Sequence, residues 1–298
     1  MKELNTTEYK LVIAHIYVIC SYIFALFISI IVGFIFRFLH PLIIVLIADL
    51  AGTIVIYIIG MIAKNSSFYD PYWGVAPLII ASFYMFFPYS SNVEVIRKII
   101  IFILISVWSV RLTLNWIRQW KGLKHEDWRY SDLRIKYGKN FWFFNLIGVH
   151  LMPTFVVYLG TISLYPALSL GAKSFGVIDI IATAITLIAI VIETLADQQL
   201  HNFRKTRENP QQIITRGLWA FSRHPNYFGE ILFWWGLFIF ALSVNLGYFL
   251  AIIGPLAMTL LFNVLSIPLM EERNLNTKPE YEKYKERVSK LIPWFPKK

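Results

Sequence analysis

Long apolar stretches separated by short polar segments dominate this chain. A membrane-spanning helix needs about 20 mainly apolar residues, and eight stretches reach or approach that length, the third and the seventh being short. They cover residues 11–36, 41–63, 72–89, 99–117, 142–165, 176–197, 229–244 and 247–268. The pattern predicts an all-α fold, a polytopic membrane helix bundle with about eight transmembrane helices. The first stretch is too long for a signal peptide, so we expect it to be retained.

The composition agrees with an integral, multi-pass membrane protein. Hydrophobic residues make up 57% and charged residues 15% of the 298 residues, whereas soluble domains average about 45–50% and about 25%. So few charges could not keep this much apolar surface in solution. No repeat or low-complexity linker interrupts the sequence, so we expect a single membrane domain over residues 1–298. Cys20 is the one cysteine, which excludes an internal disulfide.

The basic residues follow the expected helices. The formal net charge is +10, and with a cytoplasmic N-terminus 23 of the 28 Lys and Arg residues fall on the cytoplasmic side and four on the other. This asymmetry is typical of positive-inside topology. It predicts that both termini are cytoplasmic, and it argues against a nucleic-acid partner because the charges follow topology. The membrane itself, a bacterial inner membrane or the endoplasmic reticulum, stays open.

Three ionisable residues lie near the end of the expected helix 176–197. Glu193, Asp197 and Arg204 are spaced by four and seven residues, so they share one helical face. Ionisable groups near membrane depth are costly and usually functional. The alternative is that the two acids only reach the membrane interface or pair with nearby arginines.

A basic and aromatic segment, RGLWAFSRHPNYFGE at residues 216–230, precedes the seventh helix. The proline after His224 favours an extended conformation there, and Asn226 is expected to cap the following helix. The free N–H groups and the dipole of a helix N-terminus favour an anion, to which Arg216 and Arg223 add charge. A phosphate-bearing cofactor fits this site, but so do lipid phosphates.

This segment and the sequence around it resemble the C-terminal domain of steroid 5α-reductases, sterol reductases and their bacterial relatives of unassigned substrate. The resemblance includes GLWAFSRHPNYFGE followed by FWWG, then GPLAMTLLFNVLSIPLMEE and PEYEKYKERVSKLIPWFP, and upstream ADQQLHNFR, SFYDPYWGVAP and GLKHEDWRY. It implies N-terminal helices over 1–140 and a cofactor-binding region over 141–298. It also implies an NADPH-dependent reductase of a carbon–carbon double bond in an apolar lipid (a sterol, steroid or polyprenoid) that enters from the bilayer.

The resemblance also implies which residues bind NADPH. Ten match positions that hold the cofactor or close its pocket: Asp197, Arg204, Arg223, His224, Asn226, Tyr227, Glu230, Glu272, Arg273 and Tyr284. No metal is expected, because the one His of HEDWRY has no second His or Cys at metal-ligand spacing. No GxGxxG is present, so a dinucleotide would bind without a Rossmann fold.

Reduction of a double bond conjugated to a carbonyl also needs a proton donor at the carbonyl oxygen. In steroid 5α-reductases an acid paired with a tyrosine has this role, and by resemblance Asp70 is that acid. Trp108 stands at the approximate position of the tyrosine, so Tyr72, Tyr130 and His150 are alternative partners. Asp before Pro is also a common helix start, and a cap is compatible with the catalytic role.

Two other functions stay open. Isoprenylcysteine carboxyl methyltransferases, which use S-adenosylmethionine, share a similar RHP-x-Y-x-G stretch and a Glu-Glu…Glu-Tyr-x-x-Tyr tail. A non-enzymatic lipid-binding or transport protein could retain the same fold. The pair Asp197 and Arg204 together with an early acid favours the reductase, because a methyltransferase requires neither.

We predict that the loops at residues 125 and 173 lie on opposite sides of the membrane. Replacing Cys20 by serine removes the native thiol, so His125→Cys and Lys173→Cys can each be labelled alone with a membrane-impermeant maleimide. Reagent on the periplasmic or luminal side should reach only the cysteine at 173. Labelling of both from one side would contradict the eight-helix topology.

Overall fold

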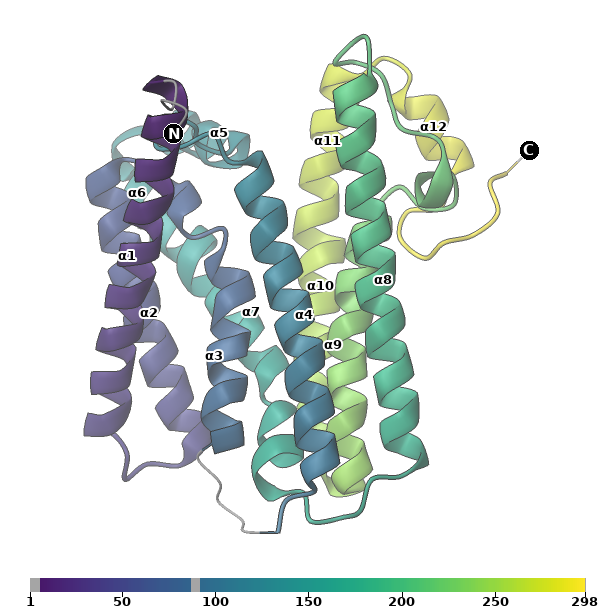
Figure 1. Ribbon diagram of the computed structural model, residues 1–298. Coiled ribbons are helices and arrows are strands. Elements are labelled where there is room, and N and C mark those ends of the chain that lie inside the picture. Colours follow the sequence, from purple (N-terminus) through teal and green to yellow (C-terminus); the bar gives the residue numbers. More distant parts are fainter. Residues whose placement is uncertain (1–5, 87–91, 298) are drawn as a thin grey trace, which may run out of the picture. The chain divides into compact units, whose positions relative to one another are not determined.

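The computed structural model describes residues 6–86 and 92–297 (Figure 1). These residues contain no β-strand, and Ser222 and Ser289 form an isolated parallel bridge. The helices are α1 (Thr6–Ile35), α2 (Pro41–Ala63), α3 (Tyr72–Phe86), α4 (Val95–Gln119), α5 (Trp128–Tyr137), α6 (Phe141–Asn145), α7 (Met152–Thr161), α8 (Val177–Thr206), α9 (Pro225–Val244), α10 (Ile253–Leu260), α11 (Ile267–Thr277) and α12 (Tyr281–Arg287). Short 3₁₀ or π segments are Ser66–Phe68, Gly138–Asn140, Leu146–Leu151, Pro166–Leu170, Gly217–Ala220, Leu246–Ile252 and Leu261–Ser266. The expected all-α class is confirmed.

Six helical runs in the described residues are long and apolar enough to cross a membrane. They are Tyr9–Ile35, Pro41–Ala63, Trp128–Leu170, Val177–Thr206, Pro225–Val244 and Leu246–Thr277. The other two expected segments, 72–89 and 99–117, correspond to α3, with 15 residues, and α4, with 25. The chain is therefore a multi-pass membrane helix bundle, while the total of eight spans and the cytoplasmic termini stay predictions.

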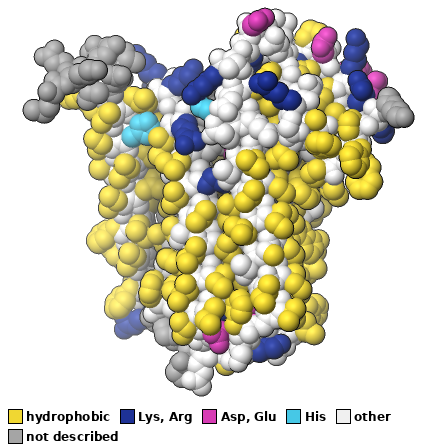
Figure 2. Space-filling model, turned by 45° about the vertical axis from the view of Figure 1, so that its right-hand side comes forward, with side chains coloured by type: hydrophobic (Ala, Val, Ile, Leu, Met, Phe, Trp, Pro, Cys, Tyr) yellow, Lys and Arg dark blue, Asp and Glu magenta, His cyan; other side chains and the backbone are white. Residues whose placement is uncertain are grey.

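Large hydrophobic side chains are exposed along the flanks of the helices. On α1, for example, Ile23, Phe27 and Phe34 are more than half exposed. Figure 2 shows hydrophobic side chains covering helix flanks, with Lys and Arg mostly near helix ends. Such continuous apolar surface is unfavourable in water but is solvated by lipid chains.

The chain folds into two compact units. Unit 1 comprises Met1–Phe83 and Ser109–Tyr158, and unit 2 comprises Tyr84–Trp108 and Leu159–Lys298. All three candidate catalytic residues belong to unit 1, and all ten candidate cofactor-binding residues belong to unit 2. The expected division of one membrane domain near residue 140 stays a prediction.

Two glycines allow α8 and α9 to pack closely within unit 2. A Cβ atom on Gly229 would lie 2.5 Å from Glu193 Cγ and 2.9 Å from the Ala189 carbonyl oxygen. A Cβ atom on Gly236 would lie 2.1 Å from Thr186 Oγ1. Small residues let membrane helices approach closely, so the spacing of these two helices is fixed where both carry candidate cofactor residues.

A buried ion pair joins α4 to the start of α8. Arg97 Nε donates to Asp179 Oδ1 at 2.7 Å, and Arg97 Nη2 donates to Asp179 Oδ2 at 3.0 Å. The guanidinium also donates to the carbonyl oxygens of Gly171 and Lys173, and the Ser243 hydroxyl donates to Asp179 Oδ1 at 2.5 Å. Both charged side chains are almost fully buried. A buried charge is tolerated in such an arrangement, a bidentate ion pair with additional hydrogen bonds.

We predict that Asp179→Ala destabilises the protein by about 3–5 kcal/mol, because it leaves the Arg97 guanidinium buried without its carboxylate. Thermal unfolding in detergent should show a large fall in Tm. Lys98→Ala, next to Arg97 on α4, is the control and should change Tm little. Equal Tm values for the Asp179 variant and the wild type would contradict a stabilising role for the pair.

Candidate functional site

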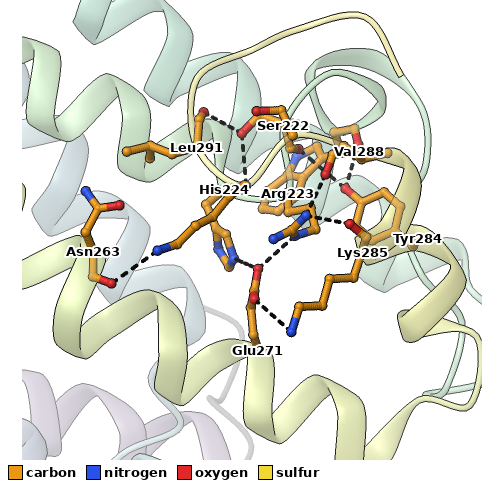
Figure 3. Close-up of polar contacts among 12 residues, drawn as sticks. Ser222, Arg223, His224, Asn263, Glu271, Tyr284, Lys285, Val288 and Leu291 are labelled. Atoms are coloured by element: carbon orange, nitrogen blue, oxygen red, sulfur yellow. Dashed lines mark hydrogen bonds and ion pairs between the residues drawn. The ribbon is translucent and has the colours of Figure 1, made fainter. Parts of the chain in front are cut away.

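The loop before α9, residues 207–224, is held by a buried ion pair (Figure 3). Arg223 Nε donates to Glu271 Oε1 at 2.7 Å, and Arg223 Nη1 donates to the carbonyl oxygens of Lys285, at 2.7 Å, and Val288. The ammonium group of Lys285 lies 3.7 Å from Glu271 Oε2. Both members of the pair are buried. Arg223 therefore anchors the loop to α11 and α12, and its expected contact with a cofactor phosphate stays a prediction.

The buried acid on α11 is Glu271, which sequence reasoning missed in favour of its neighbour Glu272. Glu272 and Arg273 are both exposed. Which of the two consecutive glutamates points inward depends on how α11 is rotated about its axis. That rotation is set by α10 and by the π segment Leu261–Ser266, which precede α11. The expected roles of Glu272 and Arg273 as closers of the pocket stay predictions.

His224 precedes α9 and is buried against the same carboxylate. Its Nε2 lies 3.3 Å from Glu271 Oε1, and its ring stacks on Tyr227 with 5.4 Å between centroids and 6° between planes. Burial lowers the pKa of the imidazole, and the carboxylate of Glu271 partly opposes this shift. The ring centroid of Tyr227 also lies 4.7 Å from that of Phe262. The Tyr227 ring therefore contacts both His224 and Phe262.

The expectation that Asn226 caps α9 is wrong. The helix begins at Pro225, so His224 is the cap residue and Asn226 lies in the first turn. The physical reason is that proline is favoured at the first helical position, where its missing N–H has no partner to lose. The Asn226 side chain instead donates to Asp197 Oδ1 at 3.4 Å. Two of the expected cofactor-binding residues are thereby brought together from α8 and α9.

Glu230, one turn further along α9, is buried among aromatic rings. The indole N–H of Trp108 donates to Glu230 Oε2 at 3.2 Å, and that of Trp234 donates to Oε1 at 2.9 Å. Phe233 stacks on Trp108 with 4.6 Å between centroids. Both carboxylate oxygens therefore have donors within the protein, and the expected contact of Glu230 with the nicotinamide–ribose end stays a prediction.

Four cations gather where α8 and α11 end. Burial, followed by the charges of Arg204, Arg207 and Arg273, lowers the pKa of Lys278 to about 8. The negative charge of Asp197 also acts on Arg204. Four neighbouring positive charges repel one another and create a local potential that favours an anion such as phosphate. Sequence reasoning selected Arg204 and Arg273 but missed Arg207 and Lys278, whose proximity depends on how the two helix ends meet.

The C-terminal residues 289–297, here called the tail strap, run along the loop at 221–223. The hydrogen bonds are Arg223 N to Ser289 O at 2.8 Å, Ser222 Oγ to Leu291 O at 2.7 Å and Trp294 N to Phe221 O at 2.9 Å. Tyr284 also supports this loop, because its hydroxyl donates to the Trp219 carbonyl oxygen at 2.6 Å. Tyr284 is buried, and its expected role in closing the pocket stays a prediction.

In unit 1, Asp70 lies beside a tyrosine. The Tyr130 hydroxyl donates to Asp70 Oδ1, and Arg129 Nη2 lies 3.7 Å from the same oxygen. The Asp70 side chain is 18% exposed. Burial raises its pKa to about 6, an effect that Arg129 and Tyr130 oppose and the charge of Asp127 strengthens. Of the candidate partners, Tyr130 is the one hydrogen-bonded to Asp70.

The segment 122–130 positions this pair by packing on residues 65–70. The Ser66 N–H donates to Glu126 Oε1 at 2.8 Å, and the Asp127 N–H donates to Ser67 Oγ at 2.9 Å. The Asn65 side chain donates to carbonyl oxygens in the same segment. These bonds join chain positions about 60 residues apart, so the contact between Asp70 and Tyr130 is a tertiary feature.

Tyr72 is paired with a different acid, which sequence reasoning missed. Its hydroxyl donates to Asp49 Oδ1 at 2.8 Å and to the Asp49 carbonyl oxygen at 3.0 Å. Asp49 is buried in α2, and its Oδ2 has no hydrogen-bond partner among the described residues. The signal was available, since a lone acid in a long apolar run is itself a functional indication. His150, the remaining alternative, is buried, and its ring centroid lies 4.7 Å from that of Tyr69.

Comparison with known proteins agrees with the resemblance at a coarse level. An uncharacterized protein of Schizosaccharomyces pombe, C594.04c, is 26% identical over 262 residues, which cover 80% of this chain and 76% of that protein. No solved structure matches. The family described as "Protein of unknown function (DUF1295)" matches residues 56–288, a range that includes all thirteen candidate residues selected from the sequence. The chain therefore belongs to the DUF1295 family.

Proposed function

We propose that this protein is an NADPH-dependent membrane reductase of a carbon–carbon double bond in an apolar lipid, such as a sterol, steroid or polyprenoid. The cation cluster at the ends of α8 and α11 carries the proposal. Burial and the neighbouring charges of Arg204, Arg207 and Arg273 disfavour the positive charge of Lys278, and a bound polyanion would relieve that cost. The resemblance of the surrounding motifs to steroid 5α-reductases favours NADPH among the possible polyanions.

The residues around the cluster divide into two groups. Arg204, Arg207, Arg273 and Lys278 would hold the phosphates, while Asp197 and Asn226, already joined by a hydrogen bond, offer partners for neutral hydroxyl or amide groups. Arg223 and Glu230 have partners inside the protein, so we assign them to support of the loop and of α9. When bound, NADPH would supply a hydride to the β-carbon of the substrate.

The proton is assigned to the pair Asp70 and Tyr130. A general acid works best when its pKa lies near the working pH, and the pKa of Asp70 is about 6. In this arrangement the tyrosine hydroxyl would donate to the carbonyl oxygen, and the protonated carboxyl would replace the proton that the hydroxyl gives up. Asp49 and Tyr72 form a second acid–tyrosine pair within unit 1, which is the alternative donor.

The first prediction concerns cofactor binding. Arg204→Ala should weaken NADPH binding by about tenfold to a hundredfold, because it removes a charged hydrogen bond worth about 1.5–3 kcal/mol. Fluorescence titration of the purified protein in detergent measures this, with NADH and S-adenosylmethionine as comparison ligands. Lys205→Ala, the adjacent cation on α8, is the control.

Arg223→Ala is less informative, because it also leaves Glu271 buried without its main partner. Unchanged NADPH affinity in a folded Arg204→Ala protein would contradict the site. Tight binding of S-adenosylmethionine without binding of NADPH would favour a methyltransferase instead.

The second prediction concerns the proton donor. Asp70→Asn should lower turnover by about 10²–10⁴-fold with little change in NADPH affinity, since the amide cannot donate a carboxylic proton. In the wild type, kcat/KM should fall as the pH rises above about 6, where Asp70 loses its proton. Oxidation of NADPH with a panel of enone steroids, sterol dienes and polyprenols provides the assay. Wild-type turnover by Asp70→Asn would exclude Asp70, and a parallel loss in Asp49→Asn would assign the role to the second pair.

A further inference from the structure

The tail strap presents apolar side chains that the described residues of unit 2 leave largely exposed. Ile292 is 62% exposed, Trp294 70% and Phe295 77%, and Phe221 beneath them is 38% exposed. The Phe295 ring lies 6.0 Å from Phe221 and 6.5 Å from Trp294. Because the Trp294 N–H is hydrogen-bonded to the Phe221 carbonyl oxygen, these aromatic groups are held on an ordered segment.

This patch lies at the level where α8 leaves its apolar stretch. The Trp219 indole N–H donates to the Ala196 carbonyl oxygen at 3.0 Å, and Trp219 belongs to the same loop as Phe221. On α8, Leu195 is 49% exposed, and Asp197 two residues further on is the next charged residue after the buried Glu193. The patch is therefore beside the part of α8 where lipid-facing side chains give way to polar ones.

Basic side chains flank the exposed apolar groups. Arg287, Lys290 and Lys297 all lie within the tail strap or directly before it, and the segment 287–297 contains no acidic residue. The Arg287 side chain donates to the Lys297 carbonyl oxygen at 3.4 Å, so the Arg287 guanidinium lies beside the backbone at the end of the strap. Tryptophan is enriched at membrane interfaces, and clustered Lys and Arg are attracted to anionic lipid head groups.

We propose that the tail strap docks on the interface of the membrane that the helices span. Ile292, Trp294 and Phe295 would insert among the head groups, and Arg287 and Lys297 would contact anionic lipid, while the ammonium group of Lys290 donates to the Asn263 carbonyl oxygen at 3.2 Å. The combination of exposed aromatic side chains, flanking cations and the level of Ala196 on α8 favours this occupant over a partner protein. The proposal goes beyond the reductase activity and does not depend on it.

Depth-dependent quenching tests the docking. In a Cys20→Ser background, Phe295→Cys carries an environment-sensitive fluorophore, and the protein is placed in nanodiscs of phosphatidylcholine with phosphatidylglycerol. Nanodiscs doped with a shallow doxyl lipid should quench the label at 295 strongly. Glu282→Cys, an exposed polar position on α12, is the matched control and should be quenched little. Ile292→Cys provides a second reporter if the first variant folds poorly.

The anionic component is tested separately. Quenching at 295 should weaken in nanodiscs without phosphatidylglycerol, and Lys297→Gln should reduce the ratio of docked to undocked strap by about fivefold when the anionic lipid is present. Equal quenching at 295 and 282 would overturn the proposal. Self-quenching of the label at 295 that appears only with two proteins in one disc would also overturn it, because the patch would then join copies of this chain.

Discussion

The ion pair between Arg223 and Glu271 joins the segments of unit 2 that carry the candidate cofactor residues. Arg223 belongs to the loop before α9 and Glu271 to α11, and the same guanidinium also binds carbonyl oxygens of Lys285 and Val288 in α12 and just after it. Loss of one partner would leave the other charge buried, at a cost of about 3–5 kcal/mol. The positions of His224 and the first turn of α9 therefore depend on this contact.

Several buried charges of the bundle are satisfied by groups of the protein itself. Arg97 and Asp179 satisfy one another, and two indole N–H groups bind Glu230. Asp49 differs, because one of its oxygens has a tyrosine hydroxyl and the other has no partner among the described residues. A low dielectric makes such an unsatisfied polar group costly.

Apolar periodicity was enough to predict the helical class and the regions of the main helices, because lipid imposes a length and a composition on each span. It placed the end of α8 at residue 197, whereas the helix continues to Thr206 through polar residues that favour helix once outside the membrane. Motif resemblance selected Asp70 but could not choose Tyr130, about 60 residues away, because that contact requires the tertiary fold. For the same reason it could not separate Glu271 from Glu272.

The strap at the end of the chain has a consequence for biosynthesis. The loop before α9 receives hydrogen bonds or carbonyl partners from residues 285–294, which are translated after α9, α10 and α11. Domains fold as units while the chain is synthesised from its N-terminus, but this loop cannot reach its final form until residues 285–294 have left the ribosome. A chain truncated before residue 285 would thus be inserted in the membrane while its loop before α9 lacks these partners.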